Sequence, residues 1–141
     1  MATNRDKKSD GTSSPDRRKT MGAKTRDRRV QVVRVLLEGS FERKLGLRDM
    51  SAEVNLSPWR LAHIFKAETG MSPQRYLTLV RLQRARDQLE TSFLSVQEIG
   101  AAVGIPNTSQ FTRSFKAAYG MTPVEYRKVH LRIVPETDDH R

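Results

Sequence analysis

The sequence predicts an all-α fold that contains one supersecondary unit twice. All strong apolar periodicities have helical spacing, and no segment shows the alternation that is typical of a strand. In addition, the pattern of residues 57–76 (SPWRLAHIFKAETGMSPQRY) returns in residues 108–126 (TSQFTRSFKAAYGMTPVEY). The residues that match at an offset of fifty are Phe65 and Phe115, Lys66 and Lys116, Ala67 and Ala117, Gly70 and Gly120, Met71 and Met121, Pro73 and Pro123, and Tyr76 and Tyr126. A repeat of this length indicates a duplicated unit.

The first unit has the pattern of a short helix, a tight turn and a second helix. A helix is predicted from Arg26 to about Gly39, and a shorter one of about eight residues begins near Leu47. Asn55 follows where a tight turn needs a left-handed residue, which asparagine tolerates. Ser57 and Pro58 then start the next helix, which ends at the glycine of residue 70. This order is typical of a helix-turn-helix.

A longer helix over residues 72–90 connects the two units, with Ser72 as its N-cap and Pro73 in its first turn. Its predicted buried stripe consists of Tyr76, Leu77, Val80, Ala85 and Leu89. At 1.5 Å per residue, about twenty residues form a rod of about 30 Å. Successive major-groove faces on one side of B-DNA are about 34–36 Å apart. One chain is therefore expected to reach two adjacent grooves.

The second unit repeats the first. Ser95 and Glu98 form a capping box for a short helix that Gly104 closes, and Asn107 or Thr108 caps the next helix. Thr122 and Glu125 form a second capping box, which begins a final helix that Tyr126 and Val129 are expected to anchor. The second tight turn is one residue longer than the first.

The composition excludes several classes of function. Cysteine is absent, so disulfides, thiolate metal sites and cysteine nucleophiles are excluded, and a reducing compartment is expected. The three histidines are scattered and no acid–base pair converges. We therefore expect no enzyme activity, no catalytic residue, no metal site and no cofactor.

The charge favours a polyanionic partner. The 141 residues carry a formal net charge of +10, of which residues 1–29 contribute +6. No apolar run reaches the length that spans a bilayer, and no signal peptide is recognised, so we expect a cytoplasmic, nucleoid-associated protein without a membrane partner. Residues 1–25 are predicted to be a disordered basic segment, either a solubilising lead or an arm that contacts phosphates. Residues 26–132 form the folded domain, and residues 133–141 are a disordered tail.

Helical spacing places a polar stripe on each repeated helix, opposite its apolar side. The residues predicted to read base edges are Trp59, Ala62 and His63 on the first helix, and Thr108, Ser109, Thr112 and Arg113 on the second. The residues predicted to contact phosphates are Ser57, Arg60, Lys66, Asn107 and Lys116. Three alternatives stay open. Trp59 is a partly buried aromatic that holds its own helix in place, Arg113 forms a salt bridge or simply lies on a solvated face, and His63 is hydrogen-bonded within the protein or faces solvent.

These motifs closely resemble the DNA-binding domain of AraC/XylS-type bacterial transcription regulators over about residues 26–132. The resemblance is strongest in residues 109–127 (SQFTRSFKAAYGMTPVEYR), and Arg81, Ala85 and Leu89 fall where the linker helix of the family carries such residues. It implies about seven helices, and two helix-turn-helix subdomains joined by the long linker helix. It also implies base contacts on the two stripes. Family members usually carry a further ligand-sensing or oligomerising domain. The chain is therefore either a stand-alone regulator or the C-terminal portion of a longer one.

The sequence thus predicts a transcription regulator, activator or repressor, that binds double-stranded DNA as a monomer on a promoter site of roughly 20 base pairs. RNA polymerase is a further candidate partner, because an activator has to contact it. The alternative function is a helical protein-interaction module that binds polymerase or another regulator without reading DNA. Deletion of residues 1–25 distinguishes the two, since DNA affinity that vanishes with this segment favours the interaction module.

Overall fold

The computed structural model describes residues 27–132, and this part of the chain is all-α. Its helices are α1 (Arg28–Gly39), α2 (Leu47–Glu53), α3 (Pro58–Thr69), α4 (Pro73–Thr91), α5 (Val96–Ala102), α6 (Thr108–Tyr119) and α7 (Pro123–His130). The expected seven helices are confirmed, and none of the described residues forms a strand. The segments 1–25 and 133–141, which were predicted to be disordered, lie outside the described residues.

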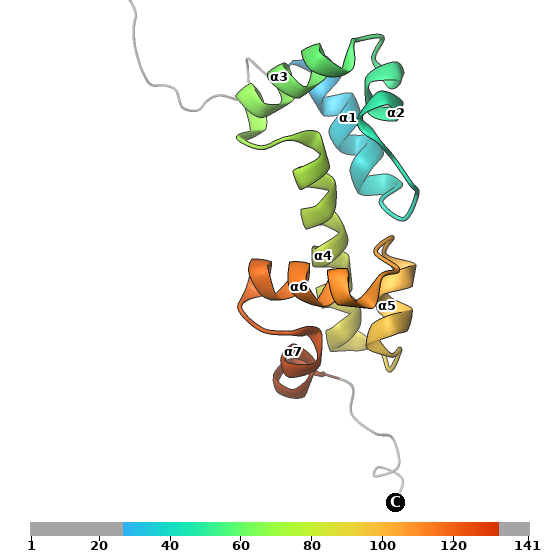
Figure 1. Ribbon diagram of the computed structural model, residues 1–141, viewed down its shortest axis with the longest axis vertical. Coiled ribbons are helices and arrows are strands. Elements are labelled where there is room, and N and C mark those ends of the chain that lie inside the picture. The colour runs from blue at the N-terminus through green and yellow to red at the C-terminus, as the bar shows by residue number, and fades with distance from the viewer. Residues whose placement is uncertain (1–26, 133–141) are drawn as a thin grey trace, which may run out of the picture.

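Two three-helix groups lie at the two ends of α4 (Figure 1). Helices α1, α2 and α3 pack together at one end, and α5, α6 and α7 pack together at the other. The long helix α4 contacts both groups and is the common element of the molecule. No helix within residues 27–132 has the length and apolarity that crossing a membrane requires.

Each three-helix group, together with part of α4, forms a subdomain with its own hydrophobic core. The core of the first subdomain is formed by Val30, Val33, Leu37, Leu45, Met50, Leu61, Phe65 and Leu77. The core of the second subdomain is formed by Leu82, Ala85, Leu89, Ile99, Val103, Ile105, Phe111 and Phe115. The N-terminal half of α4 thus contributes to the first core, and the C-terminal half contributes to the second.

The tight turns and caps form as their sequence signals predict. Asn55 has a φ of 56° and Gly104 a φ of 96°, so each turn contains the left-handed residue that it needs. The Ser95–Glu98 and Thr122–Glu125 capping boxes are both present. Because these signals act over three or four residues, local sequence is sufficient to specify them.

Two expectations are corrected. The first helix begins at Arg28 rather than Arg26, because Asp27 is its N-cap and accepts a hydrogen bond from the Arg29 amide. Val129 does not anchor the last helix, because its side chain is 65% exposed. The other predicted anchor, Tyr126, does pack against the second core, and the buried Pro123 also holds helix α7.

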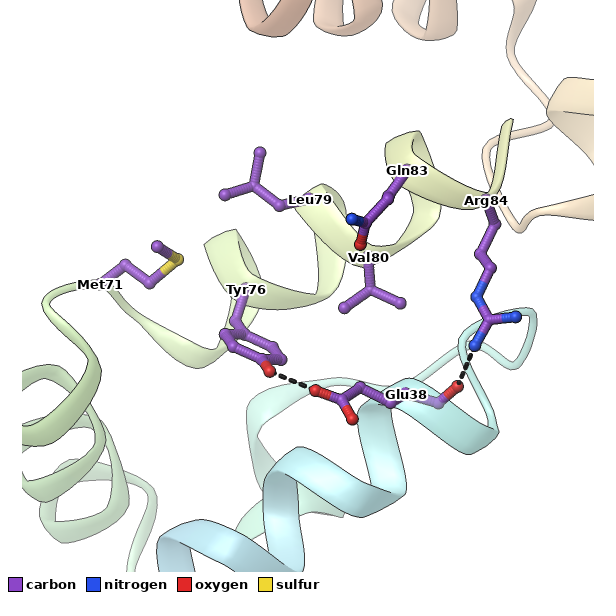
Figure 2. A pocket seen from close by; sticks show the side chains of 7 residues that line it. All are labelled: Glu38, Met71, Tyr76, Leu79, Val80, Gln83 and Arg84. Carbon is purple, nitrogen blue, oxygen red and sulfur yellow. Dashed lines mark hydrogen bonds between the residues drawn. The ribbon is translucent and has the colours of Figure 1, made fainter. Parts of the chain in front are cut away.

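The duplication extends to a tyrosine–carboxylate contact between helices. The Tyr76 hydroxyl of α4 donates a hydrogen bond to Glu38 of α1 (Figure 2). In the second subdomain, the Tyr126 hydroxyl of α7 donates to Glu90 of α4. Burial and the neighbouring carboxylate raise the pKa of both phenols, that of Tyr126 to about 12. The C-terminal half of α4 therefore takes the place in the second subdomain that α1 takes in the first.

Candidate nucleic-acid interface

Helices α3 and α6 are equivalent from end to end. Ser57 caps α3 by accepting the Arg60 amide at 3.0 Å, and Asn107 caps α6 by accepting the Gln110 amide at 2.9 Å. Each helix has twelve residues and ends at a left-handed glycine whose amide donates to the carbonyl oxygen of Lys66 or Lys116 at 2.8 Å. Of the two residues predicted as caps of α6, Asn107 is therefore the cap.

Fully buried residues fix how each helix is rotated. Leu61 and Phe65 enter the first core, while Phe111 and Phe115 enter the second, and all four have 0% exposure. A helix anchored by two large side chains one turn apart must turn its other side to solvent. The rotation of α3 and α6 therefore follows from core packing, independently of any ligand.

The predicted residues lie on the solvent side of both helices. The exposed base-reading candidates are Trp59, His63, Thr108, Ser109 and Arg113, and the half-buried ones are Ala62 and Thr112. The phosphate candidates Ser57, Arg60, Lys66, Asn107 and Lys116 are all exposed. Trp59 and Ser109, Ala62 and Thr112, and His63 and Arg113 occupy matching places in the two helices. The repeat therefore presents two equivalent surfaces with different side chains.

The exposed surface of α3 carries two aromatic rings that contact each other, those of Trp59 and His63. Trp59 is 67% exposed, so it does not serve as a partly buried pin for its helix. Its ring lies against the ring of His63, with 3.8 Å between the centroids and an angle of 30° between the planes. His63 Nδ1 lies 2.9 Å from the Trp59 carbonyl oxygen, which can only accept, so Nδ1 carries the hydrogen. In the neutral imidazole, Nε2 is then left as a hydrogen-bond acceptor.

The surface of α6 is built from donors and hydroxyls. Thr108, Ser109 and Thr112 each offer a hydroxyl, and Arg113 offers the planar fork that fits guanine. Within residues 27–132 the ion pairs join Arg29 with Asp27 and Arg132 with Glu90, so the salt bridge considered for Arg113 does not form there. The two helices thus carry different hydrogen-bonding chemistry.

The capping residues keep a donor for a second partner. Ser57 Oγ accepts the Arg60 amide, which leaves its hydroxyl hydrogen free, and Asn107 Oδ1 accepts the Gln110 amide, which leaves its Nδ2 hydrogens free. Sequence reasoning missed Gln110, an exposed amide in the first turn of α6. The internal repeat could have identified Gln110, because it lies fifty residues after Arg60, a predicted phosphate contact.

Helix α4 connects the two surfaces. Its 19 residues correspond to about 30 Å, close to the roughly 34–36 Å between successive major-groove faces. In Figure 1, α3 lies across the upper end of α4, and α6 passes across the lower half of α4. No cluster of potential metal ligands occurs among the described residues.

Comparison with known proteins identifies the family. A family model described as a helix-turn-helix domain matches residues 50–129. The structure is similar to that of an AraC-type DNA-binding-domain protein from Chromobacterium violaceum, with a TM-score of 0.69 and 27% identity, covering 76% of this chain and 96% of that one. The chain belongs to the AraC/XylS family of transcription regulators.

Other AraC/XylS-type proteins give the same result. The C-terminal domain of AraT, a response regulator from Geobacillus stearothermophilus, has a TM-score of 0.73 and 30% identity, covering 82% of this chain and 94% of that one. The transcriptional activator NphR from a Rhodococcus species is 33% identical over 104 residues, which are 74% of this chain and 31% of NphR. The chain spans about a third of the length of such curated relatives.

Proposed function

We propose that the chain is a sequence-specific DNA-binding transcription regulator whose α3 and α6 enter two adjacent major grooves of one duplex. The observation that carries this proposal is the pair of equivalent, N-capped helices with exposed polar stripes, one in each of the two groups that α4 connects. Membership of the AraC/XylS family supports the same function. The protein-interaction module is not favoured by the comparisons.

On α3, His63 Nε2 accepts a hydrogen bond from an exocyclic amine of cytosine or adenine, and Trp59 packs on a thymine methyl. Ala62 adds only an apolar contact. On α6, Arg113 donates two hydrogen bonds to guanine, while Thr108, Ser109 and Thr112 contact neighbouring base edges. The geometry that supports these roles is the exposure of Trp59, His63 and Arg113 on helices whose rotation is fixed by their cores.

Phosphate contacts position the two helices without specifying sequence. Arg60 and the capping Ser57 approach the backbone at the start of α3, and Asn107 does so at the start of α6. Lys66 and Lys116 approach it from the last turns. Because the two lysines occupy matching positions, we expect them to contact equivalent phosphates one helical turn apart.

One chain binds one site of roughly 20 base pairs, because the two surfaces together take the place of a dimer. RNA polymerase is the second partner that we propose, with the activator NphR as the supporting relative. Binding to chromosomal DNA would place the protein in the cytoplasm, on the nucleoid.

Selection from a random duplex library with the purified chain, at about 150 mM salt, tests this function. We expect enrichment of one asymmetric motif. If no motif is enriched and binding collapses as salt rises, the affinity comes from non-specific charge attraction and the proposal is wrong. Adding polymerase to the selected duplex then tests the second partner. The chain, the duplex and polymerase should form a ternary complex, and polymerase should not bind this duplex without the chain.

A further inference from the structure

The loop of residues 40–46, between α1 and α2, contacts both subdomains. Its Phe41 side chain packs against the first hydrophobic core and also against the second. Phe41 therefore lies between the two cores. A large aromatic side chain in this position opposes changes in the angle between the subdomains, because any such change removes part of its buried surface.

Arg81, near the middle of α4, holds this loop in place with two hydrogen bonds. Its Nε donates to the Phe41 carbonyl oxygen and its Nη2 donates to the Arg43 carbonyl oxygen, both at 2.7 Å. Hydrogen bonds from a charged donor in two directions fix the loop more firmly than one neutral bond. Arg81 is half-buried, and this burial lowers the pKa of its guanidinium, although arginine stays charged.

The turn between α5 and α6, which belongs to the second subdomain, lies against Arg81 and the Phe41 carbonyl group. A Cβ atom on Gly104 would lie 2.9 Å from Arg81 Nε and 3.0 Å from the Phe41 carbonyl oxygen. The left-handed φ of 96° also favours glycine at this position. Residues 40–46, the middle of α4 and the α5–α6 turn therefore converge, and we call Phe41, Arg81 and Gly104 the joint.

A further arginine of α4 supports the joint from the side of α1. The Arg84 guanidinium lies 5.0 Å from the centroid of the Phe41 ring. Its Nη2 also donates to the Glu38 carbonyl oxygen at 3.4 Å, next to the Tyr76–Glu38 contact (Figure 2). These contacts hold the end of α1, from which the loop departs, against α4.

We propose that the joint fixes the separation and angle of α3 and α6, and that Phe41 and Arg81 thereby determine which spacing of the two half-sites the protein accepts. This inference rests on the proposed function. One inserted base pair lengthens the site by about 3.4 Å and rotates one half-site by about 35°. A rigid pair of recognition helices cannot follow both changes, whereas a loosened pair can.

The first test uses duplexes in which the selected half-sites are moved apart or together by one or two base pairs. We expect the wild-type chain to lose about tenfold in affinity for a single inserted base pair. Phe41→Ala should lose less than about threefold, because the subdomains become free to reorient. Arg81→Lys should behave in the same way, because lysine keeps the charge but loses the planar fork.

Gln83→Ala is the matched control, since Gln83 is an exposed residue of α4 outside the joint. It should retain the wild-type spacing preference. If Phe41→Ala and Arg81→Lys also retain that preference, the inference is overturned. Far-UV circular dichroism verifies that each variant is folded at the assay temperature, and Arg81→Lys carries the test if Phe41→Ala unfolds.

A second test needs no DNA and separates the inference from the proposed function. Because the chain has no cysteine, Ala67→Cys and Ala117→Cys place two spin labels at matching exposed positions of α3 and α6. We expect a narrow distance distribution that widens clearly with Phe41→Ala or Arg81→Lys. Equal widths would overturn the joint. A widening without any selected DNA motif would support the joint and refute the proposed function instead.

Discussion

Arg113 is an exposed side chain on α6, one turn before Lys116. If it donates two hydrogen bonds to a guanine, Arg113→Ala should cost about 1–3 kcal/mol of binding free energy and relax the preference at one base pair. The measurement is a competition titration against the selected duplex and each single-base variant of it. Equal losses on the selected and a scrambled duplex would refute the base-reading role.

Lys116→Ala is the control for Arg113→Ala, because both remove one positive charge from the same face of α6. A phosphate contact carries no sequence information, so Lys116→Ala should weaken binding to all duplexes alike. It should also lower the slope of log affinity against log salt by about 1. A change in base preference for this variant would contradict its assignment.

Gly100 is a buried residue of α5 with close neighbours. A Cβ atom there would meet the Ile105 carbonyl oxygen at 2.8 Å and Phe111 Cδ2 at 3.1 Å. The backbone cannot retreat easily, since the Ile105 amide donates to the Gly100 carbonyl oxygen at 2.8 Å. Overpacking costs about 1–3 kcal/mol, more than the roughly 1 kcal/mol that alanine gains from its helix propensity. Gly100→Ala should therefore lower the free energy of unfolding, measured in urea.

Gly39→Ala is the matched control, because nothing lies within 4 Å of a Cβ atom at Gly39, the last residue of α1. It should leave the unfolding free energy unchanged or slightly raised. If Gly100→Ala is as stable as Gly39→Ala, the packing around Ile105 must be looser than these distances indicate.

At the scale of the element, the ends of the helices follow from the sequence. Ser57, Ser72, Ser95 and Thr122 each accept a hydrogen bond from the amide three residues later, as predicted. Such bonds are local, so the sequence within one turn is enough to place them. The outward faces of α3 and α6 were predictable for a similar reason, because the apolar spacing fixes which side is buried.

Contacts between distant elements were not predictable from such patterns. Val129 fits helical spacing but is exposed, because helix α7 is short and uses its first turns to pack. Phe41 and its carbonyl oxygen lie in a segment that local patterns describe only as a loop. The tyrosine–glutamate pairs join residues at least 36 positions apart. Periodicity within one helix carries no information about such partners.

Burial of the Tyr126 phenol, together with its hydrogen bond to Glu90, makes the attachment of α7 dependent on pH. The raised pKa of about 12 means that folding favours the neutral phenol, against an ordinary value of 10.0. The stabilisation is therefore complete below about pH 10 and is lost as the pH rises toward 12. Tyr126→Phe should lower the unfolding free energy by about 1 kcal/mol at pH 8, where the hydrogen bond is present.

Urea unfolding of the wild type and Tyr126→Phe at intervals between pH 8 and about pH 11.5 measures this dependence. The difference between the two proteins should shrink as the phenol ionises. Glu90 keeps its ion pair with Arg132 at 2.9 Å in both proteins, so that contact cancels. A difference that stays constant over the whole range would show that Tyr126 stabilises α7 through packing alone.

At the scale of the whole molecule, positive charge is shared between residues 27–132 and the N-terminal segment. Residues 27–132 contain seventeen Lys and Arg against ten Asp and Glu, a net charge of +7. Deletion of residues 1–25 should therefore lower affinity for all duplexes by a similar factor and reduce the salt dependence. The ratio of affinities for the selected and scrambled duplexes should survive. Disappearance of this ratio would favour the protein-interaction function.

The central claim is that one chain reads two adjacent major grooves with α3 and α6. Hydroxyl-radical footprinting of the selected duplex, with stoichiometry determined by native mass spectrometry, measures it most directly. We predict one chain per duplex and two protected segments about 10–10.5 base pairs apart, on one side of the helix. A single protected segment, or two chains on each duplex, would contradict the account, because each chain would then use only one recognition helix.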